Sequence, residues 1–414
     1  MLYELYELQR AFLTPMAAFA KLGAHAYGDG LLSALPFSER MAAGYELLSR
    51  VGKFYDKPEF GLVETVLTDG GKVAVRQRVV LRKPFCELLH FERDMPAGRA
   101  PDPVVLVVAP LSGHHATLLR DTVRQLLPSH DVYITDWLDA RHVPLSKGAF
   151  HLDDYVAYVR DFFAFLGPIH VVGVCQPTVP VLAAISLMST AGDPNLPKTM
   201  TLMGGPIDTR RSPTEVNALA KREPYEWFER TVICSVPERY PGYLRRVYPG
   251  FLQLGGFVAM NPGKHFQSHW DFYRDLVKGA DESAEAHRRF YDEYNAVMDM
   301  PAEYYLDTIK VVFQEHQLPR GEWRCKGVRV APEDITQVPL LTVEGELDDI
   351  SGSGQTQAAH DLCSGIAAAH KRHFTAPGCG HYGIFSGRRW REAIYPQLHD
   401  FIRAYDRTGE DAKG

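Results

Sequence analysis

The feature that most constrains the fold is a series of short apolar strands that alternate with helical segments through much of the chain. Successive positions of each strand are apolar, so both faces of the strand are expected to be buried, as in a parallel sheet covered by helices. The expected strands are Val104–Ala109, Val132–Thr135, His170–Val174, Met200–Met203, Leu340–Val343 and Arg372–Thr375. The expected helices lie near Thr117–Leu127, Asp153–Phe165, Val179–Met188, Gln355–Ala368 and Arg389–Tyr405. The pattern predicts an α/β fold with a mostly parallel central sheet and helices on both faces.

A hairpin precedes this alternation. From Leu62 the apolar period changes to two, and the segments 63–67 and 73–81 flank the turn residues Asp69-Gly70-Gly71. Two alternating segments around such a turn predict an antiparallel hairpin. A hairpin that enters a mostly parallel sheet is typical of the start of an α/β-hydrolase fold.

The alternation stops near Thr209 and resumes near Val338. The stretch between is rich in aromatic residues and mostly helical in pattern, with Pro-Gly breaks at 241–242, 249–250 and 262–263. We therefore predict an inserted helical cap. The expected organisation is an N-terminal helical extension at residues 1–60, a core at 61–209 and 326–414, and an aromatic-rich cap at 210–325.

The N-terminal extension has an apolar stripe at helical spacing. Its members are Leu5, Leu8, Phe12, Met16 and Phe19, with Glu4, Glu7, Arg10 and Lys21 on other faces. The simplest interpretation is that this stripe packs onto the main domain. An apolar contact with a partner subunit or a lipid-like particle is the alternative.

Composition narrows the range of functions. Lys+Arg 45 against Asp+Glu 51 gives a net charge of −6, which provides no general attraction to nucleic acid or anionic lipid. Six cysteines without a C-x-x-C pair favour free thiols in a reducing cytoplasm. The first residues lack the basic and apolar regions of a signal peptide, and the uncharged stretch Gly167–Gly192 is interrupted by prolines. We expect a soluble, cytoplasmic protein without a membrane span.

The strongest local motif is Val-Val-Gly-Val-Cys-Gln-Pro at residues 171–177. An apolar strand that ends in Gly-x-nucleophile-x-small before a helix is a nucleophile elbow, here with Cys175 as the nucleophile and Pro177 in place of the usual last glycine. The tight turn is expected to require a small neighbour at Gly173. The backbone N–H of Gln176 is free to face an oxyanion, and the following helix dipole favours a thiolate. A buried structural cysteine is the alternative for the motif taken alone.

An acid and a histidine follow in the order that this elbow requires. The strand that begins near Leu340 leads to Asp348 and Asp349, and the loop after the next strand carries His381. Nucleophile, acid and histidine in this sequence order form the triad of α/β-hydrolases. An acid followed two residues later by Ile or Val is common at this position of the fold, which favours Asp348 over Asp349. We predict Cys175, Asp348 and His381 as the catalytic residues.

The loop after the strand Val104–Ala109 is expected to supply a second oxyanion donor. The backbone N–H of Leu111 or Ser112 is the geometric candidate. His114 and His115 could help to bind a substrate, but we expect single loop histidines to be solvated. Cys379 is close to His381 in sequence, yet no Cys/His cluster has metal spacing, so we predict neither a metal site nor a cofactor.

Four segments resemble the intracellular poly(3-hydroxybutyrate) depolymerases. These are the opening residues 1–15, the elbow at 173–177, the cap segment 303–321 and Gly-His-Tyr-Gly at 380–383. The resemblance covers essentially the whole chain. It implies an α/β-hydrolase that mobilises stored, amorphous polyester inside bacterial cells, with Cys175, Asp348 and His381 as the triad. It also implies a substrate at the surface of storage granules, which gives the apolar N-terminus and the aromatic cap a role.

Three other functions remain open at this point. Polyhydroxyalkanoate synthases share the fold and a cysteine nucleophile, but their elbow ends in glycine where this chain has Pro177. A non-catalytic granule-surface protein would not need an ordered triad. A cysteine esterase or thioesterase for small soluble esters would have the same triad. The sequence leaves open the preferred length of the substrate's side chain and the acyl acceptor (water or coenzyme A). It also leaves open the oligomeric state, and a homo-oligomer is one of the possibilities.

Overall fold

The computed structural model describes residues 2–406 of the chain, and a nine-stranded sheet crosses this part of it. The strands are β1 (Glu64–Val66), β2 (Lys72–Lys83), β3 (Cys86–Arg93), β4 (Val104–Val108), β5 (Asp131–Trp137), β6 (His170–Val174), β7 (Thr199–Met203), β13 (Leu340–Gly345) and β14 (Lys371–Ala376). Their order across the sheet is β1-β2-β3-β5-β4-β6-β7-β13-β14.

The sheet is parallel from β5 to β14 and antiparallel at its other end. β5, β4, β6, β7, β13 and β14 pair in parallel, while β1, β2 and β3 form antiparallel ladders that join β5. The expected hairpin is present, with Glu64 opposite Ala74 and Gly70 in the left-handed region at φ 87°. This topology confirms the predicted α/β-hydrolase fold.

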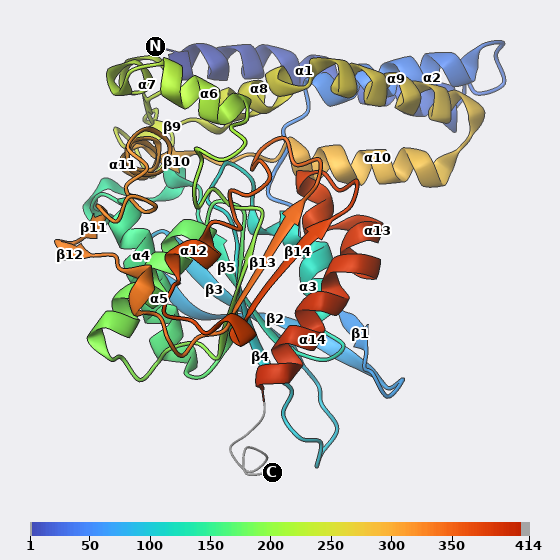
Figure 1. Cartoon of the computed structure of the whole chain (residues 1–414). Helices are drawn as coiled ribbons and strands as arrows, with labels where there is room; N and C mark the ends of the chain where they lie inside the picture. Colours follow the sequence, from blue (N-terminus) through green and yellow to red (C-terminus); the bar gives the residue numbers. More distant parts are fainter. Residues whose placement is uncertain (1, 407–414) are drawn as a thin grey trace.

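Helices cover both faces of the sheet and create two apolar cores (Figure 1). The helices of this part are α3 (Arg120–Leu126), α4 (Leu152–Leu166), α5 (Thr178–Ala191), α12 (Ala359–Leu362), α13 (Gly387–Arg389) and α14 (Tyr395–Tyr405). Alternate residues of β4 show the arrangement. Leu106 and Val108 pack with α4 and α5, whereas Val105 and Val107 pack with α3 and α14. The uniformly apolar strands are thus buried on both sides.

Short helices complete these connections. The 3-10 segments are η1 (Ala116–Leu119), η2 (Ala140–His142), η3 (Leu145–Lys147), η5 (Pro332–Asp334), η6 (Ala368–His370) and η7 (His381–Ile384), and the π-helical segments are η4 (Ile309–Gln314) and η8 (Trp390–Ile394).

The chain leaves the sheet between β7 and β13 for a long, mostly helical segment. Its helices are α6 (Glu215–Arg222), α7 (Tyr225–Thr231), α8 (Gly250–Met260), α9 (Pro262–Lys278), α10 (Asp281–Tyr294) and α11 (Ala302–Thr308). Its strands are β8 (Cys234–Ser235), β9 (Arg246–Tyr248), β10 (Met300–Pro301), β11 (Arg324–Cys325) and β12 (Val328–Arg329). In Figure 1, α8, α9 and α10 lie beyond the arrowheads of β13 and β14, above the carboxyl ends of the strands.

The predicted helix over Gln355–Ala368 is wrong for most of its length. Only α12 is helical there, between turns. One reason is the packing of Gly365, where a Cβ would lie 2.3 Å from the carbonyl oxygen of Glu333 and 2.8 Å from that of Ile335. This contact holds the backbone in a turn that a regular helix would displace.

Two N-terminal helices, α1 (Leu2–Gly28) and α2 (Ser38–Val51), pack against each other and lie beside α8 and α9 (Figure 1). The expectation that the apolar stripe of α1 packs onto the main domain is wrong. Leu5, Leu8, Phe12, Met16 and Phe19 are all exposed, and the buried residues of α1 are Tyr3, Glu7, Ala17 and Ala20. Of the helices within residues 2–406, none is both long and apolar enough to cross a bilayer.

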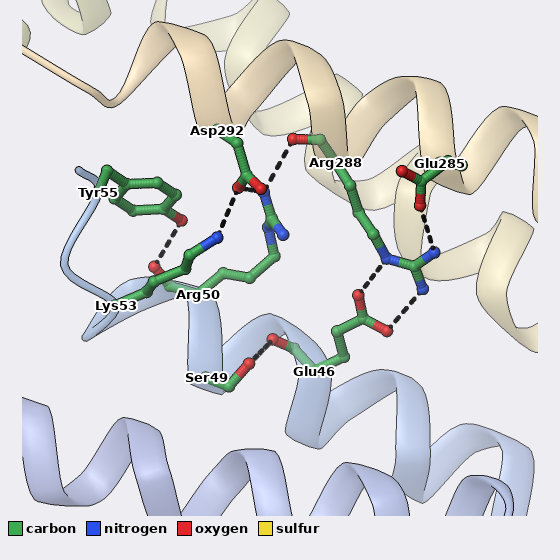
Figure 2. A network of polar contacts seen from close by, with 8 residues as sticks. All are labelled: Glu46, Ser49, Arg50, Lys53, Tyr55, Glu285, Arg288 and Asp292. Atoms are coloured by element: carbon green, nitrogen blue, oxygen red, sulfur yellow. Dashed lines mark hydrogen bonds and ion pairs between the residues drawn. The ribbon is translucent and has the colours of Figure 1, made fainter. Parts of the chain in front are cut away.

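Ion pairs join α2 to α10 (Figure 2). Arg288 donates two hydrogen bonds to the carboxylate of Glu46, at 2.6 and 2.9 Å. Arg50 and Lys53 both donate to Asp292, at 2.6 and 2.9 Å. A bidentate arginine–carboxylate pair fixes orientation as well as distance. The N-terminal helices are therefore attached to the inserted segment in a defined position.

A double-mutant cycle tests this attachment. Glu46→Gln and Arg288→Gln are expected to show a coupling of about 0.5–1 kcal/mol in the free energy of unfolding, since the pair is bidentate and only partly exposed. Urea denaturation measures it. The matched control is the exposed pair Arg388–Glu392, with 3.7 Å between its charged atoms, for which we expect a coupling near zero. Equal coupling in the two cycles would contradict a structural role for the Glu46–Arg288 pair.

Candidate active site

Cys175 lies at the tip of a sharp turn between β6 and α5. Its φ of 69° is in the left-handed region, where a non-glycine residue is strained. The turn is held by its neighbours: the N–H of Cys175 donates to the carbonyl of Met203 at 2.7 Å, and its carbonyl accepts from Thr178 at 3.1 Å. The side chain is partly exposed. The structure thus gives residues 171–177 the conformation of a nucleophile elbow.

The small residues that this turn requires are Gly204 and Gly205, after β7. A Cβ on Gly205 would lie 1.8 Å from Oγ1 of Thr178 and 2.5 Å from the carbonyl oxygen of Cys175. A Cβ on Gly204 would lie 2.9 Å from Ile384. The expected requirement at Gly173 is wrong, because a Cβ there would make only ordinary contacts of 3.5 Å or more. The crowding comes from the neighbouring strand, which no local motif reveals.

His381 connects the cysteine to one carboxylate. Its Nε2 lies 3.2 Å from Sγ of Cys175, and its Nδ1 lies 2.8 Å from Oδ2 of Asp348. The other oxygen of Asp348 accepts the N–H groups of Ile350 and Ser351, at 2.9 and 2.8 Å. The structure therefore brings together the three side chains that the sequence selected from segments far apart in the chain.

Asp349 is directed away from this group. Its carboxylate accepts a hydrogen bond from Nδ2 of Asn261 at 3.0 Å and lies 3.6 Å from the ammonium group of Lys264. About half of the Asp349 side chain is exposed, whereas that of Asp348 is fully buried. Of the two adjacent acids, only Asp348 contacts the histidine.

The electrostatics favour a protonated imidazole at His381. Burial by itself lowers the pKa of His381, but the negative charges of Cys175 and Asp348 and the hydrogen bonds to both raise it well above the usual 6.5. An imidazole placed between a thiol and a carboxylate can take the proton of the thiol, and the thiolate is the nucleophilic form of sulfur.

The candidate oxyanion donors are Gln176, Leu111 and Ser112. Within residues 2–406, no hydrogen bond found in the structure uses the backbone N–H of any of the three. The loop that carries Leu111 and Ser112 is fixed at its start. There the carbonyl of Ala109 accepts hydrogen bonds from Nε1 of Trp137 at 2.8 Å and from the hydroxyl of Tyr155 at 3.0 Å. Free N–H groups suit an oxyanion, and their role stays a prediction.

The two histidines of this loop are buried, so the expectation that they are solvated is wrong. Nε2 of His114 lies 3.0 Å from the carbonyl oxygen of Tyr294 in α10, and its ring stacks on Phe257 in α8 at 5.0 Å. Burial lowers the pKa of His114 to about 4 and that of His115 to about 3. The inserted segment covers His114, which the local sequence could not indicate.

Sequence reasoning missed the side chain of Gln176 and two tyrosines beside the nucleophile. The Gln176 side chain is buried, and in the described part of the chain neither its Nε2 nor its Oε1 has a partner. Tyr304 is buried and Tyr382 is partly buried; burial raises the pKa of both phenols, and the proximity of Cys175 adds to the effect. Tyr382 could have been found from its place after His381. Tyr304 could not, because α11 reaches the site only through tertiary packing.

No group of three or more His, Cys, Asp or Glu side chains in the part described by the structure is arranged to hold a metal. Cys379 is buried, and its thiol donates to the adjacent carbonyl of Gly380 at 3.4 Å.

The close approach at Gly205 gives a stability test. Gly205→Ala is expected to lower the free energy of unfolding by about 1–3 kcal/mol, since the added carbon overpacks the elbow. Gly256→Ala in α8, where a Cβ has no neighbour within 4 Å, is expected to raise it by roughly 0.5–1 kcal/mol through helix propensity. Urea denaturation measures both. A neutral Gly205→Ala would mean that β7 and the elbow are not in close contact.

The His381–Asp348 contact predicts a titration shift. Asp348→Asn is expected to lower the pKa of His381 toward 6.5, because it removes a negative charge from Nδ1, whereas Asp349→Asn is expected to leave it unchanged. The measurement is histidine NMR titration, with the His381 signal assigned by its loss in His381→Ala. A raised pKa stabilises the folded state below pH 6.5, and this contribution is lost as the pH rises through the raised value. The same shift in both variants would place the wrong carboxylate beside His381.

The chain is similar to several solved structures at low sequence identity. Solved structures that are similar include a monoacylglycerol lipase of Paleococcus ferrophilus (14% identity, TM-score 0.45, covering 74% of this chain and 96% of that one). A second is the 2-hydroxy-6-oxo-6-phenylhexa-2,4-dienoate hydrolase BPHD of Rhodococcus sp. strain RHA1 (13% identity, TM-score 0.45, covering 80% of this chain and 99% of that one). A third is an esterase of Thermogutta terrifontis (12% identity, TM-score 0.39, covering 83% of this chain and 98% of that one). Among curated proteins, none matches the sequence.

The family comparison is more specific. The family model described as "PHB de-polymerase C-terminus" matches residues 204–406. The match begins just after β7 and covers the inserted segment, β13, β14 and the loops that carry Asp348 and His381. This region, which supplies two of the three clustered side chains, is similar to the PHB de-polymerase C-terminus family.

Proposed function

We propose that this carboxylic ester hydrolase cleaves the ester bonds of stored, amorphous poly(3-hydroxybutyrate) through a Cys-His-Asp triad. The observation that carries the proposal is the continuous contact from Sγ of Cys175 through His381 to Asp348, at 3.2 and 2.8 Å. The family match over 204–406 supports the polyester as substrate. The enzyme would act in the cytoplasm at the surface of storage granules.

The geometry supports acyl transfer in two steps. His381 holds the proton of the Cys175 thiol, and the thiolate attacks the ester carbonyl to form a tetrahedral oxyanion beside the N–H of Gln176 and that of Leu111 or Ser112. The carbon–oxygen bond to the alcohol breaks, and His381 gives its proton to the departing oxygen. This leaves an acyl thioester on Cys175.

The second step releases the acyl group. His381 takes a proton from water, and the resulting hydroxide attacks the thioester carbonyl. The carbon–sulfur bond breaks, the thiolate of Cys175 is restored, and the product leaves as a 3-hydroxybutyrate monomer or oligomer. Asp348 holds Nδ1 of His381 throughout and stabilises its imidazolium form. No cofactor takes part in the proposed steps.

The decisive experiment measures soluble 3-hydroxybutyrate products released from amorphous poly(3-hydroxybutyrate) particles. The native protein is expected to release them. Cys175→Ala and His381→Ala are expected to lose activity by about 10²–10⁴-fold, because each removes a group that makes or breaks bonds. Asp348→Asn should be far more damaging than Asp349→Asn, which is the matched control. Circular dichroism of each variant checks that it is folded.

The other outcomes separate the alternatives. A folded His381→Ala variant that keeps more than about 1% of the activity would remove His381 from the triad. Turnover of short soluble esters without release from particles would indicate a small-ester esterase. Chain extension from hydroxyacyl-coenzyme A, without release, would indicate a synthase-like acyltransferase.

A further inference from the structure

The helix α1 has an apolar stripe toward solvent, while the charged residue Glu7 is buried on its inner side. Its outward stripe consists of Leu5, Leu8, Phe12, Met16, Phe19 and Leu22, each between 46% and 70% exposed. These residues recur three or four positions apart, so they form one continuous face. A surface helix of a globular protein normally has the opposite arrangement, with its apolar stripe in the core.

Polar contacts hold α1 in this orientation. Glu7 is buried, pairs with Arg239 and accepts a hydrogen bond from the hydroxyl of Tyr240 at 3.0 Å. The hydroxyl of Tyr3 donates to the buried carboxylate of Asp299 at 2.6 Å. Rolling the apolar stripe inward would break these buried contacts and leave charges unpaired, which is costly. The exposed stripe is therefore a fixed property of the fold.

Small residues on the inner side bring α1 close to α2. Ala17 and Ala20 are buried, and a Cβ on Gly23 would lie 2.9 Å from the ring of Tyr45. The ion pairs of Figure 2 then hold α2 to α10. The outer face of α1 is thus connected rigidly to the segment that covers the candidate active site.

We propose that the outer face of α1 is the surface by which the enzyme docks on a water-insoluble polyester particle. The inference rests on the function proposed above, and it adds the surface that brings the active site to that substrate. Contact with the particle removes the six apolar side chains from water, which is the driving force of docking.

The charge distribution of α1 favours an uncharged surface as the partner that binds its outer face. The stripe itself contains no charged residue, and the acidic Glu4 and Glu7 of α1 balance Arg10 and Lys21. Helices that bind anionic bilayers have many basic residues on their polar face, and the net charge of −6 adds no attraction to such a bilayer. An uncharged polyester surface requires only apolar contact.

The stripe is long and narrow. From Leu5 to Leu22 it is about 26 Å long and about 10 Å wide. An extended particle surface can cover its whole length.

The position of α1 suits this role. Figure 1 shows α1, α2, α8 and α9 as a layer at the end of the molecule toward which β13 and β14 point. The loops that carry Asp348 and His381 leave the sheet at the same end. Docking through α1 therefore brings the edge of the sheet that bears the triad toward the substrate.

Binding is tested in the Cys175→Ala background, so that the particle is not consumed. The probe is a suspension of protein-free amorphous poly(3-hydroxybutyrate) particles, and bound protein is measured by sedimentation. Adding Leu8→Gln, Phe12→Gln and Phe19→Gln is expected to lower the partition constant by at least about tenfold, since three apolar side chains lose their contact. The matched control adds Val66→Gln, Leu145→Gln and Phe165→Gln, three apolar residues similarly exposed elsewhere, and is expected to bind as before. Unchanged binding of the α1 variant would overturn the proposal.

Activity with Cys175 intact separates docking from chemistry. The α1 variant is expected to hydrolyse a soluble 3-hydroxybutyrate trimer within about twofold of the native rate, and to lose about tenfold on particles. Native protein that hydrolyses the trimer but does not bind particles would overturn docking alone. Native protein that binds particles through α1 but cleaves neither substrate would overturn the proposed reaction and leave docking intact.

Two further measurements address other occupants of the face. Light scattering that finds a native dimer and a monomeric α1 variant would make the face an interface between copies and overturn the proposal. Sedimentation with phosphatidylcholine vesicles would do the same if they bound the protein as well as the polyester does. Neither result is expected, because an extended, uncharged surface suits the long stripe and α1 has few basic residues.

Discussion

The parallel register of the central sheet is the constraint on which the candidate site depends. In a parallel sheet the carboxyl ends of neighbouring strands lie at one edge, so the loops that follow β6, β13 and β14 meet there. Cys175 comes from the first of these loops, Asp348 from the second and His381 from the third. Three side chains distant in sequence can therefore form one hydrogen-bonded line.

The three hydrogen-bonded side chains also need space, which the neighbouring strand β7 provides. Gly204 and Gly205 at the end of β7 keep the region beneath the elbow and beside His381 free of side chains. The strained backbone of Cys175 is held by the carbonyl of Met203, also in β7. β7 contributes no member of the triad, yet it sets the geometry of the nucleophile.

The parts outside the core supply a cover and, by our proposal, a docking surface. Buried His114 contacts both α8 and α10, so the inserted segment is packed onto the loop that would stabilise the oxyanion. Polar anchors hold α1 with its apolar side outward. On the proposed insoluble substrate, the cover would exclude water from the reaction and the exposed helix would bind the particle.

The sequence by itself determined the fold class, the hairpin, most strand and helix positions, and the choice of Cys175, Asp348 and His381. These follow from local signals, because apolar periodicity and the order of nucleophile, acid and histidine are properties of the chain. Only the tertiary structure decided the orientation of α1, the burial of His114 and His115, the need for glycine at 205 and the nearness of Tyr304. The deciding contacts come from distant segments: buried polar anchors for α1, the inserted helices for His114, and the packing of β7 and α11 around the elbow.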